Sequence, residues 1–139
     1  VPVLKSLRLI QIIKFLKVIQ EYEKKFGKVN TVLLLQPTSP FRSLGKVNLA
    51  FNKYLYFKKK KSVLSVSETN YYYKRSFKIK KKSLILCRKK KNNLFQANGN
   101  FYIATATFIK KNLSFYKKNF TYPIVIKKNR ESIEIEFVY

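Results

Sequence analysis

The chain has 139 residues, of which 46% are hydrophobic and 16% aromatic, enough for one domain with a buried core. Lys and Arg number 31 against six acidic residues, all of them Glu, and the formal net charge is +25. The absence of His and Asp excludes a Ser-His-Asp triad and a histidine-ligated zinc site, and a single cysteine, Cys87, excludes an intrachain disulfide.

The positive charge has two interpretations. A strongly basic chain is typical of a nucleic-acid-binding protein, and the interleaved Tyr and Lys of residues 71–82 suit stacking on single strands. However, the cations are mostly Lys instead of the Arg that recognises phosphate in a bidentate manner, and Asn, Ile, Phe and Tyr are also abundant. We therefore favour a composition-driven charge on solvated surfaces and expect no specific nucleic-acid site.

No apolar run approaches the roughly 20 residues that a membrane-spanning helix needs. Basic residues are spread evenly through residues 1–20 instead of preceding an apolar core, so no signal peptide is expected. We expect a cytoplasmic protein that does not contact a membrane.

The first part of the chain predicts a helix, a strand and a loop. Apolar residues recur at helical spacing over residues 4–26, and Gly27 suits the C-cap. Residues 31–35 form a continuous apolar run, which is typical of a parallel strand buried on both faces. Two prolines then prevent regular structure over residues 36–43.

The pattern continues with a helix over residues 44–57, capped by Ser43, and a strand over residues 62–66. Helices that alternate with strands indicate an α/β fold with crossovers between parallel strands. One domain over residues 1–139 is the simplest organisation.

The second half of the chain predicts shorter elements. Residues 70–95 are rich in Tyr and Lys and predict two or three antiparallel strands with long loops. Asn98–Asn100 predicts a turn before a strand over residues 101–104. The remaining elements are a short helix over residues 105–111 and strands over residues 123–126 and 132–136.

The loop after the first strand carries groups suited to ligand binding. An amide, two hydroxyls and a guanidinium come from Gln36, Thr38, Ser39 and Arg42. The loop follows the carboxyl end of a strand, where ligands bind in open α/β sheets. A proline-stiffened connector explains the same residues equally well.

Two acidic residues near the end of the chain form the other candidate group. Glu134 and Glu136 are two apart on a predicted strand, so their carboxylates face the same side. A cation between them would relieve their repulsion, and carboxylate ligands favour Mg²⁺. The alternative is a solvated strand edge neutralised by lysines.

Four segments resemble motifs of one family, in the same order and at natural spacings. LLQPTSPFR at residues 34–42 is similar to the family's LLQPTSPLR, and SVLSVSE at residues 62–68 to SVVSVTE. NGNFYI at residues 98–103 is similar to NGAIYI, and ESIEIE at residues 131–136 to ESIDIDTE. On these motifs the chain resembles the acylneuraminate cytidylyltransferases, or CMP-sialic acid synthetases, over their C-terminal half to two-thirds.

The resemblance implies a Rossmann-like nucleotidyltransferase fold, incomplete at its N-terminal strand and phosphate loop, with an antiparallel dimerisation element at residues 70–97. It also implies a homodimer that takes CTP and a nine-carbon acidic sugar, namely neuraminic, legionaminic or pseudaminic acid. A deoxy-octulosonic acid, which has eight carbons, stays open as an alternative. In that reaction the anomeric hydroxyl of the sugar attacks the α-phosphorus of CTP and pyrophosphate leaves. Mg²⁺ and basic groups neutralise the phosphate charge.

The resemblance also implies roles for residues around the sugar. Gln36 and Tyr102 match family residues that lie at the sugar site. Arg88 matches an arginine that binds the acidic sugar. Lys74, or alternatively Arg75, matches a second basic sugar contact.

Further positions carry over in the same way. Glu134 and Glu136 match paired metal-binding aspartates. Phe115 and Tyr116 match an aromatic pair that lines the site of the partner subunit. The loop of the site is represented by Pro37, Thr38, Ser39 and Arg42.

The chain departs from the family pattern at several points. Glu in place of Asp adds a methylene to each metal ligand, which disturbs the tight geometry of Mg²⁺. Gln96 stands where the family tends to carry Arg, and the glycine-rich loop that binds the CTP phosphates is absent. These departures suggest a fragment that is inactive alone or, alternatively, a degenerate sugar-binding or dimerising module. A sheet without its first strands would expose an apolar edge, so we expect poor solubility.

Overall fold

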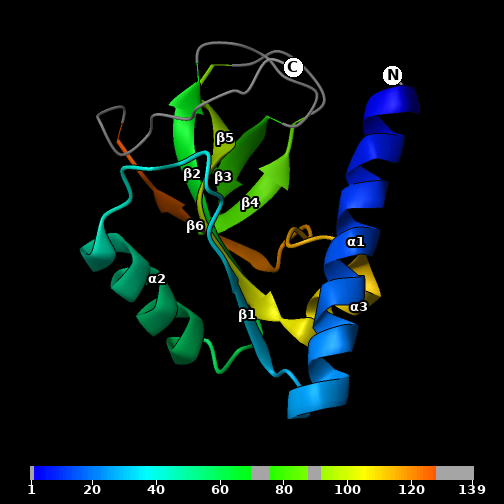
Figure 1. The fold of residues 1–139 in the computed structure, drawn as a ribbon. Helices are drawn as coiled ribbons and strands as arrows, with labels where there is room; N and C mark the ends of the chain where they lie inside the picture. Colours follow the sequence, from blue (N-terminus) through cyan, green and yellow to red (C-terminus); the bar gives the residue numbers. More distant parts are fainter. Residues whose placement is uncertain (1, 70–75, 88–91, 128–139) are drawn as a thin grey trace.

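The computed structural model describes residues 2–69, 76–87 and 92–127, with side chains from residue 11 onward. The elements of these residues are α1 (Pro2–Phe26), β1 (Thr31–Leu34), α2 (Leu44–Tyr56), β2 (Ser62–Thr69), β3 (Phe77–Lys80), β4 (Ser83–Leu86), β5 (Leu94–Thr105), α3 (Ala106–Asn112) and β6 (Thr121–Val125). The described strands form one six-stranded sheet, with α1 and α2 on opposite sides of it (Figure 1).

The long strand β5 is the central strand of the sheet and pairs with three of the other described strands. β2 pairs with one edge of β5, and β1 and β3 pair with its other edge, all in antiparallel orientation. β6 adds to β2 in parallel, and β4 adds to β3 in antiparallel orientation. Because β1 and β2 are both antiparallel to β5, they run in the same direction and α2 is the crossover between them. The α/β class predicted from the sequence is therefore confirmed.

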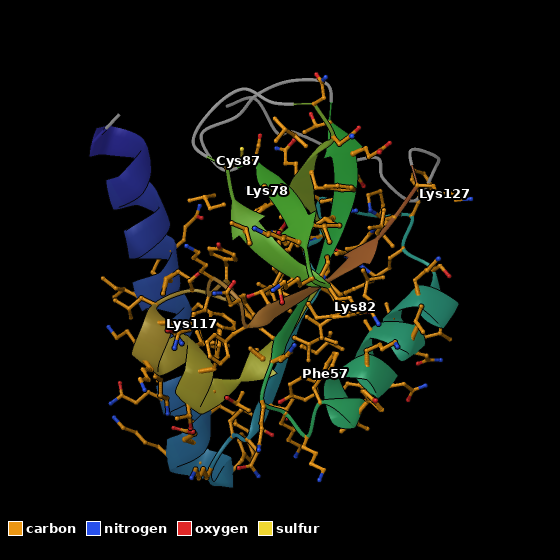
Figure 2. The ribbon with its side chains drawn as sticks, turned by 180° about the vertical axis from the view of Figure 1, so that it is seen from behind. Phe57, Lys78, Lys82, Cys87, Lys117 and Lys127 are labelled. Atoms are coloured by element: carbon orange, nitrogen blue, oxygen red, sulfur yellow. The ribbon has the colours of Figure 1, made fainter. Side chains whose placement is uncertain are left out.

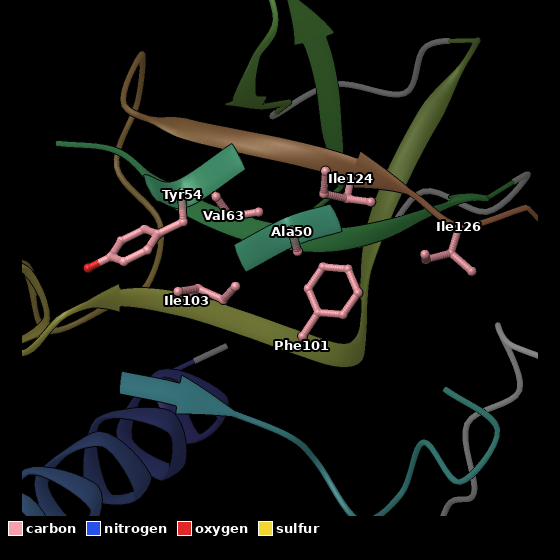
Figure 3. Close-up of a cluster of buried hydrophobic side chains, with 7 residues drawn as sticks. All are labelled: Ala50, Tyr54, Val63, Phe101, Ile103, Ile124 and Ile126. Atoms are coloured by element: carbon pink, nitrogen blue, oxygen red, sulfur yellow. The ribbon is translucent and has the colours of Figure 1, made fainter. Parts of the chain in front are cut away.

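Two apolar cores lie on the two faces of the sheet. The buried members of the first, under α2, are Ala50, Tyr54, Val63, Phe101, Ile103, Ile124 and Ile126 (Figure 3). The second includes Phe15 of α1 and Ile109 of α3. Alternate residues of β5 serve the two cores, because successive side chains of a strand point to opposite faces. Tyr102 thus belongs to the second core and its neighbour Phe101 to the first.

The C-terminal end of α1 and the N-cap of α2 lie where the sequence predicts, and α3 begins one residue later than predicted. Gly27 follows α1 with φ of 92° and donates its N–H to the carbonyl oxygen of Glu23. Ser43 caps α2, and its Oγ accepts from the N–H of Lys46 at 3.3 Å. Thr105 caps α3 in the same manner. None of the described helices is both long and apolar enough to cross a membrane.

The environment predicted for β1 is wrong. β1 pairs with β5 in antiparallel orientation, and its residues are only partly buried, with Leu33 40% exposed. The strand buried on both faces is β2, in which every residue from Ser62 to Ser67 is buried. An apolar run indicates that a strand contacts the core, but its position in the sheet depends on distant strands. Among the described strands, only β5 pairs with β1.

The turn predicted at Asn98–Asn100 is also wrong. These residues lie inside β5, which is continuous from Leu94 to Thr105. The strand instead contains a bulge. Leu64 pairs with Tyr102 and Val66 with Ala97, so the single residue Ser65 of β2 lies opposite residues 98–101 of β5. Gly99 has φ of 75°, so the Asn-Gly pair marks the left-handed residue of a bulge and not a chain reversal.

The predicted antiparallel strands are present as the β3–β4 hairpin. The prediction of long loops in this region is wrong at the hairpin, because only Lys81 and Lys82 connect the two strands. Residues 70–75 and 88–91 of the predicted dimerisation element lie outside the described residues, as does the predicted strand at residues 132–136.

Candidate functional site

The loop after β1 is fastened along β5 at the bulge. The N–H of Gln36 donates to the carbonyl oxygen of Gly99 at 3.3 Å, and the N–H of Ser39 donates to the carbonyl oxygen of Gln36 at 3.1 Å. Ser39 is fully buried, and its Oγ donates to the carbonyl oxygen of Asn98 at 2.7 Å. Ser39 and Asn98 are about 60 residues apart in the chain. The two motif segments that contain them therefore form one candidate site.

A third motif segment, in β2, supports the bulge from its other side. Asn98 Nδ2 donates to Ser67 Oγ at 2.7 Å, and Asn98 Oδ1 accepts from the N–H of Asn100 at 3.2 Å. Ser65 Oγ accepts from the N–H of Phe101 at 3.0 Å and donates to its carbonyl oxygen at 3.2 Å. These groups are buried, and their hydrogen bonds offset the cost of removing them from water.

Arg42 binds both parts of the site. Its Nε donates to the carbonyl oxygen of Asn100 at 3.0 Å, and its Nη2 donates to the carbonyl oxygen of Gln36. The planar guanidinium fixes two acceptors in one geometry. Arg42 therefore ties the backbone of Gln36 to β5.

The side chains of Gln36 and Tyr102 meet beside the bulge. Both residues are half-buried, and Tyr102 Oη donates to Gln36 Oε1 at 3.4 Å. This contact uses the carboxamide oxygen as acceptor, and the carboxamide N–H groups are donors for a ligand oxygen. The Tyr102 ring lies 5.5 Å from that of Phe115, which lies 6.0 Å from that of Phe15. The second core thus holds Tyr102 in position.

The predicted aromatic pair packs within this chain. Phe115 is buried in the second core. Tyr116 Oη accepts from the N–H of Leu86 at 2.9 Å, and its ring lies 5.0 Å from that of Phe77. A contribution of Phe115 and Tyr116 to the site of a partner subunit stays a prediction.

The structure thus brings together Gln36, Ser39, Arg42 and Tyr102. Of the other loop residues, Pro37 is exposed and Thr38 is half-buried. The predicted sugar contacts Lys74 and Arg88 and the predicted metal ligands Glu134 and Glu136 lie outside the described residues. Within the ranges that the structure does describe, no three His, Cys, Asp or Glu side chains cluster as a metal site requires.

Sequence reasoning did not assign site roles to Asn98, Gly99 or Ser67. Their contacts depend on the pairing of β2 with β5 and on the bulge, which no local pattern specifies. One signal was available, because a strand with Ser62, Ser65 and Ser67 inside a core must find hydrogen-bond partners for three hydroxyls.

Three of the described lysines lie on separate parts of the molecule. Lys78 lies on β3, Lys117 follows α3 and Lys127 follows β6, with Lys117 and Lys127 at opposite sides of the view in Figure 2. The expectation that the chain has no specific nucleic-acid site stays a prediction.

The mixed α/β sheet, with a polar loop at the carboxyl end of β1, is compatible with the Rossmann-like nucleotidyltransferase fold. No protein-family model matches the chain. The chain is similar to a curated protein, CMP-N,N'-diacetyllegionaminic acid synthase of Legionella pneumophila subsp. pneumophila. The identity is 36% over an alignment 118 positions long, which covers 77% of the chain. The chain spans about half the length of this relative, 49%. It belongs to the acylneuraminate cytidylyltransferase, or CMP-sialic acid synthetase, family.

Proposed function

We propose that the gene product containing this chain transfers CMP from CTP to a nine-carbon acidic sugar, and that Gln36 and Tyr102 lie at the sugar. The observation that carries the proposal is the fastening of the Gln36–Arg42 loop onto the bulge of β5, which presents the Gln36 carboxamide beside the Tyr102 phenol. The activity is proposed for the intact gene product, because the chain spans 49% of its relative.

The proposed reaction is a displacement at phosphorus. The anomeric oxygen of the sugar forms a bond to the α-phosphorus of CTP, and the bond from that phosphorus to the bridging oxygen of the β-phosphate breaks. Pyrophosphate leaves with the electron pair, and the hydroxyl proton passes to solvent. Orientation of the two substrates supplies much of the rate in such a step, so residues that fix the sugar contribute directly.

Gln36 is proposed to orient the sugar through its carboxamide N–H groups, which suit carboxylate and hydroxyl oxygens. Arg88 and Lys74 are proposed to neutralise the sugar carboxylate. Phe115 and Tyr116 are proposed to line the site across a homodimer.

Mg²⁺ is proposed as the metal, with Glu134 and Glu136 as its carboxylate ligands. When bound, the ion would neutralise charge on the phosphates of CTP. The described residues supply no alternative cluster of ligands.

Titration calorimetry of the gene product that contains this chain, with N,N'-diacetyllegionaminic acid and separately with CTP, tests the role of Gln36. Gln36→Ala should weaken sugar binding by about tenfold or more, because hydrogen bonds to the sugar are lost, and should leave CTP binding unchanged. Gln20→Ala, which replaces an exposed Gln on α1, is the matched control and should bind both ligands as the wild type does. Equal sugar affinity in Gln36→Ala and wild type would contradict the assignment.

A further inference from the structure

We propose that Gly99 is a positioning residue of the sugar site. The absence of a side chain at this point of β5 allows Gln36 to hold its carboxamide against the strand, in the orientation that receives the sugar. The inference rests on the proposed function and adds to it a residue that acts through Gln36.

The distances around Gly99 show why no larger residue fits. A Cβ added at Gly99 would stand 2.3 Å from Gln36 Oε1, 2.8 Å from Ser39 Oγ and 3.3 Å from Gln36 Cδ. Cβ atoms in proteins essentially never approach other heavy atoms within 3.0 Å. Any side chain at residue 99 must therefore displace both Gln36 and Ser39.

The backbone of the loop resists this displacement more strongly than the Gln36 side chain does. Ser39 is buried and bonded to Asn98, and the carbonyl oxygen of Gln36 is held by Arg42. The Gln36 carboxamide is held by a long contact of 3.4 Å with Tyr102. A Cβ at Gly99 should therefore turn the carboxamide away from Tyr102 and strain the Ser39 contact. The expected result is a loss of sugar binding.

The chain supplies a matched control for backbone strain. Gly27 also has a left-handed φ, 92° against 75° at Gly99, but a Cβ at Gly27 would meet no atom within 4 Å. Gly27→Ala and Gly99→Ala therefore impose a similar conformational penalty, and only Gly99→Ala adds the collision with Gln36 and Ser39.

The experiment combines these glycine variants with substitutions that remove the atoms of Gln36 and Ser39 with which the added Cβ collides. Gly99→Ala and Gly27→Ala are made in the wild type and in the Gln36→Ala/Ser39→Ala background, which lacks the three atoms nearest to the added Cβ. Three quantities are measured for each variant of the gene product: the thermal unfolding midpoint, and the affinities for N,N'-diacetyllegionaminic acid and for CTP by calorimetry.

We expect Gly99→Ala to bind the sugar about tenfold or more weakly and CTP normally, with Gly27→Ala binding both as the wild type does. Gly99→Ala should also lower the unfolding midpoint more than Gly27→Ala, and this excess should disappear in the Gln36→Ala/Ser39→Ala background. The proposal would be overturned if Gly99→Ala bound the sugar as tightly as Gly27→Ala does. It would also be overturned if Gly99→Ala still lowered the unfolding midpoint more than Gly27→Ala in the Gln36→Ala/Ser39→Ala background.

If Gly99→Ala does not fold alone, the same change in the Gln36→Ala/Ser39→Ala background decides the question. A folded triple variant supports the proposal, and an unfolded one overturns it. A wild-type protein that binds no sugar would overturn the proposed function and the sugar role of Gly99. The unfolding midpoints would still show, separately, whether Gly99 positions Gln36.

Discussion

At the scale of single residues, Glu23 links the end of α1 to α3 and to the chain before β1. Its carboxylate accepts from Lys110 Nζ at 3.0 Å and from the N–H of Val29 at 3.0 Å. The hydrogen bond from Lys110, then that from Val29, holds the pKa of Glu23 below its usual value of 4.5. A carboxyl whose pKa is lowered by folding stabilises the folded state above its unfolded pKa, and this contribution is lost as the pH falls through the folded pKa.

Glu23→Gln should therefore lower the unfolding midpoint at pH 7, and its difference from the wild type should shrink as the pH falls below 4.5. Thermal unfolding between pH 7 and pH 3, followed by circular dichroism, measures this difference. Glu21→Gln, at an exposed position on the same helix, is the control for loss of one negative charge. A Glu23→Gln difference that is constant with pH would show that the contact does not act through ionisation.

Arg42 illustrates a limit of sequence reasoning at the same scale. Its place in the QPTSPFR motif makes Arg42 a candidate site residue, and a cation there suggests a ligand contact. The structure directs its guanidinium to two backbone carbonyls, of Gln36 and Asn100. The second acceptor is 58 residues away in the chain, so only the tertiary fold specifies that contact.

At the scale of elements, the hairpin between β3 and β4 contains avoidable strain. Lys81 and Lys82 connect the strands with φ of 50° and 58°, the left-handed conformation of a type I′ turn. Lysine pays a steric penalty there that Asn and Gly largely avoid. Lys81→Asn with Lys82→Gly should therefore raise the free energy of unfolding by about 1 kcal/mol.

Urea unfolding measures the effect of this double substitution. Lys117→Asn with Lys118→Gly removes the same charges where neither residue has a positive φ, and it should give no gain. An equal gain in both variants would mean that relief of charge repulsion, and not turn geometry, stabilises the protein.

The elements differ in how well the sequence predicts them. The ends of α1 and α2 follow from Gly27 and Ser43, because caps act over one helical turn. The continuation of β5 through Asn98 does not follow from the sequence, because an Asn-Gly pair is a turn signal when considered locally. Ser67 and Ser39 bond to Asn98 from other segments and stabilise the bulge instead.

At the scale of the whole molecule, β1 has one edge to which no other described strand pairs. The N–H of Ala106 donates to the carbonyl oxygen of Asn30, next to the start of β1. In an antiparallel ladder, successive residues alternate between bonding to the partner strand and facing away from it. The backbone N–H and carbonyl groups of Thr31 and Leu33 therefore face away from β5. Leu33 and Leu35, each 40% exposed, place apolar side chains beside this edge. An exposed edge strand with apolar side chains favours association with other chains.

We therefore expect this chain to self-associate, and Leu33→Lys to reduce the association because a charged residue on an edge strand opposes pairing. Sedimentation velocity over a range of protein concentrations measures the effect. Leu113→Lys, at an apolar position that is 46% exposed after α3, is the matched control. Equal association in the two variants would place the contact elsewhere on the surface.

The central claim is the proposed transfer of CMP to an acidic sugar, and synthesis of a CMP-sugar tests it most directly. The assay supplies CTP, Mg²⁺ and N,N'-diacetyllegionaminic acid, with the other nine-carbon acidic sugars in parallel, to the wild type and to Gln36→Ala. The account predicts a CMP-sugar and pyrophosphate from the wild type, and a rate lowered by about tenfold or more in Gln36→Ala. A folded gene product that binds the sugar but forms no CMP-sugar would contradict catalysis and favour a sugar-binding module.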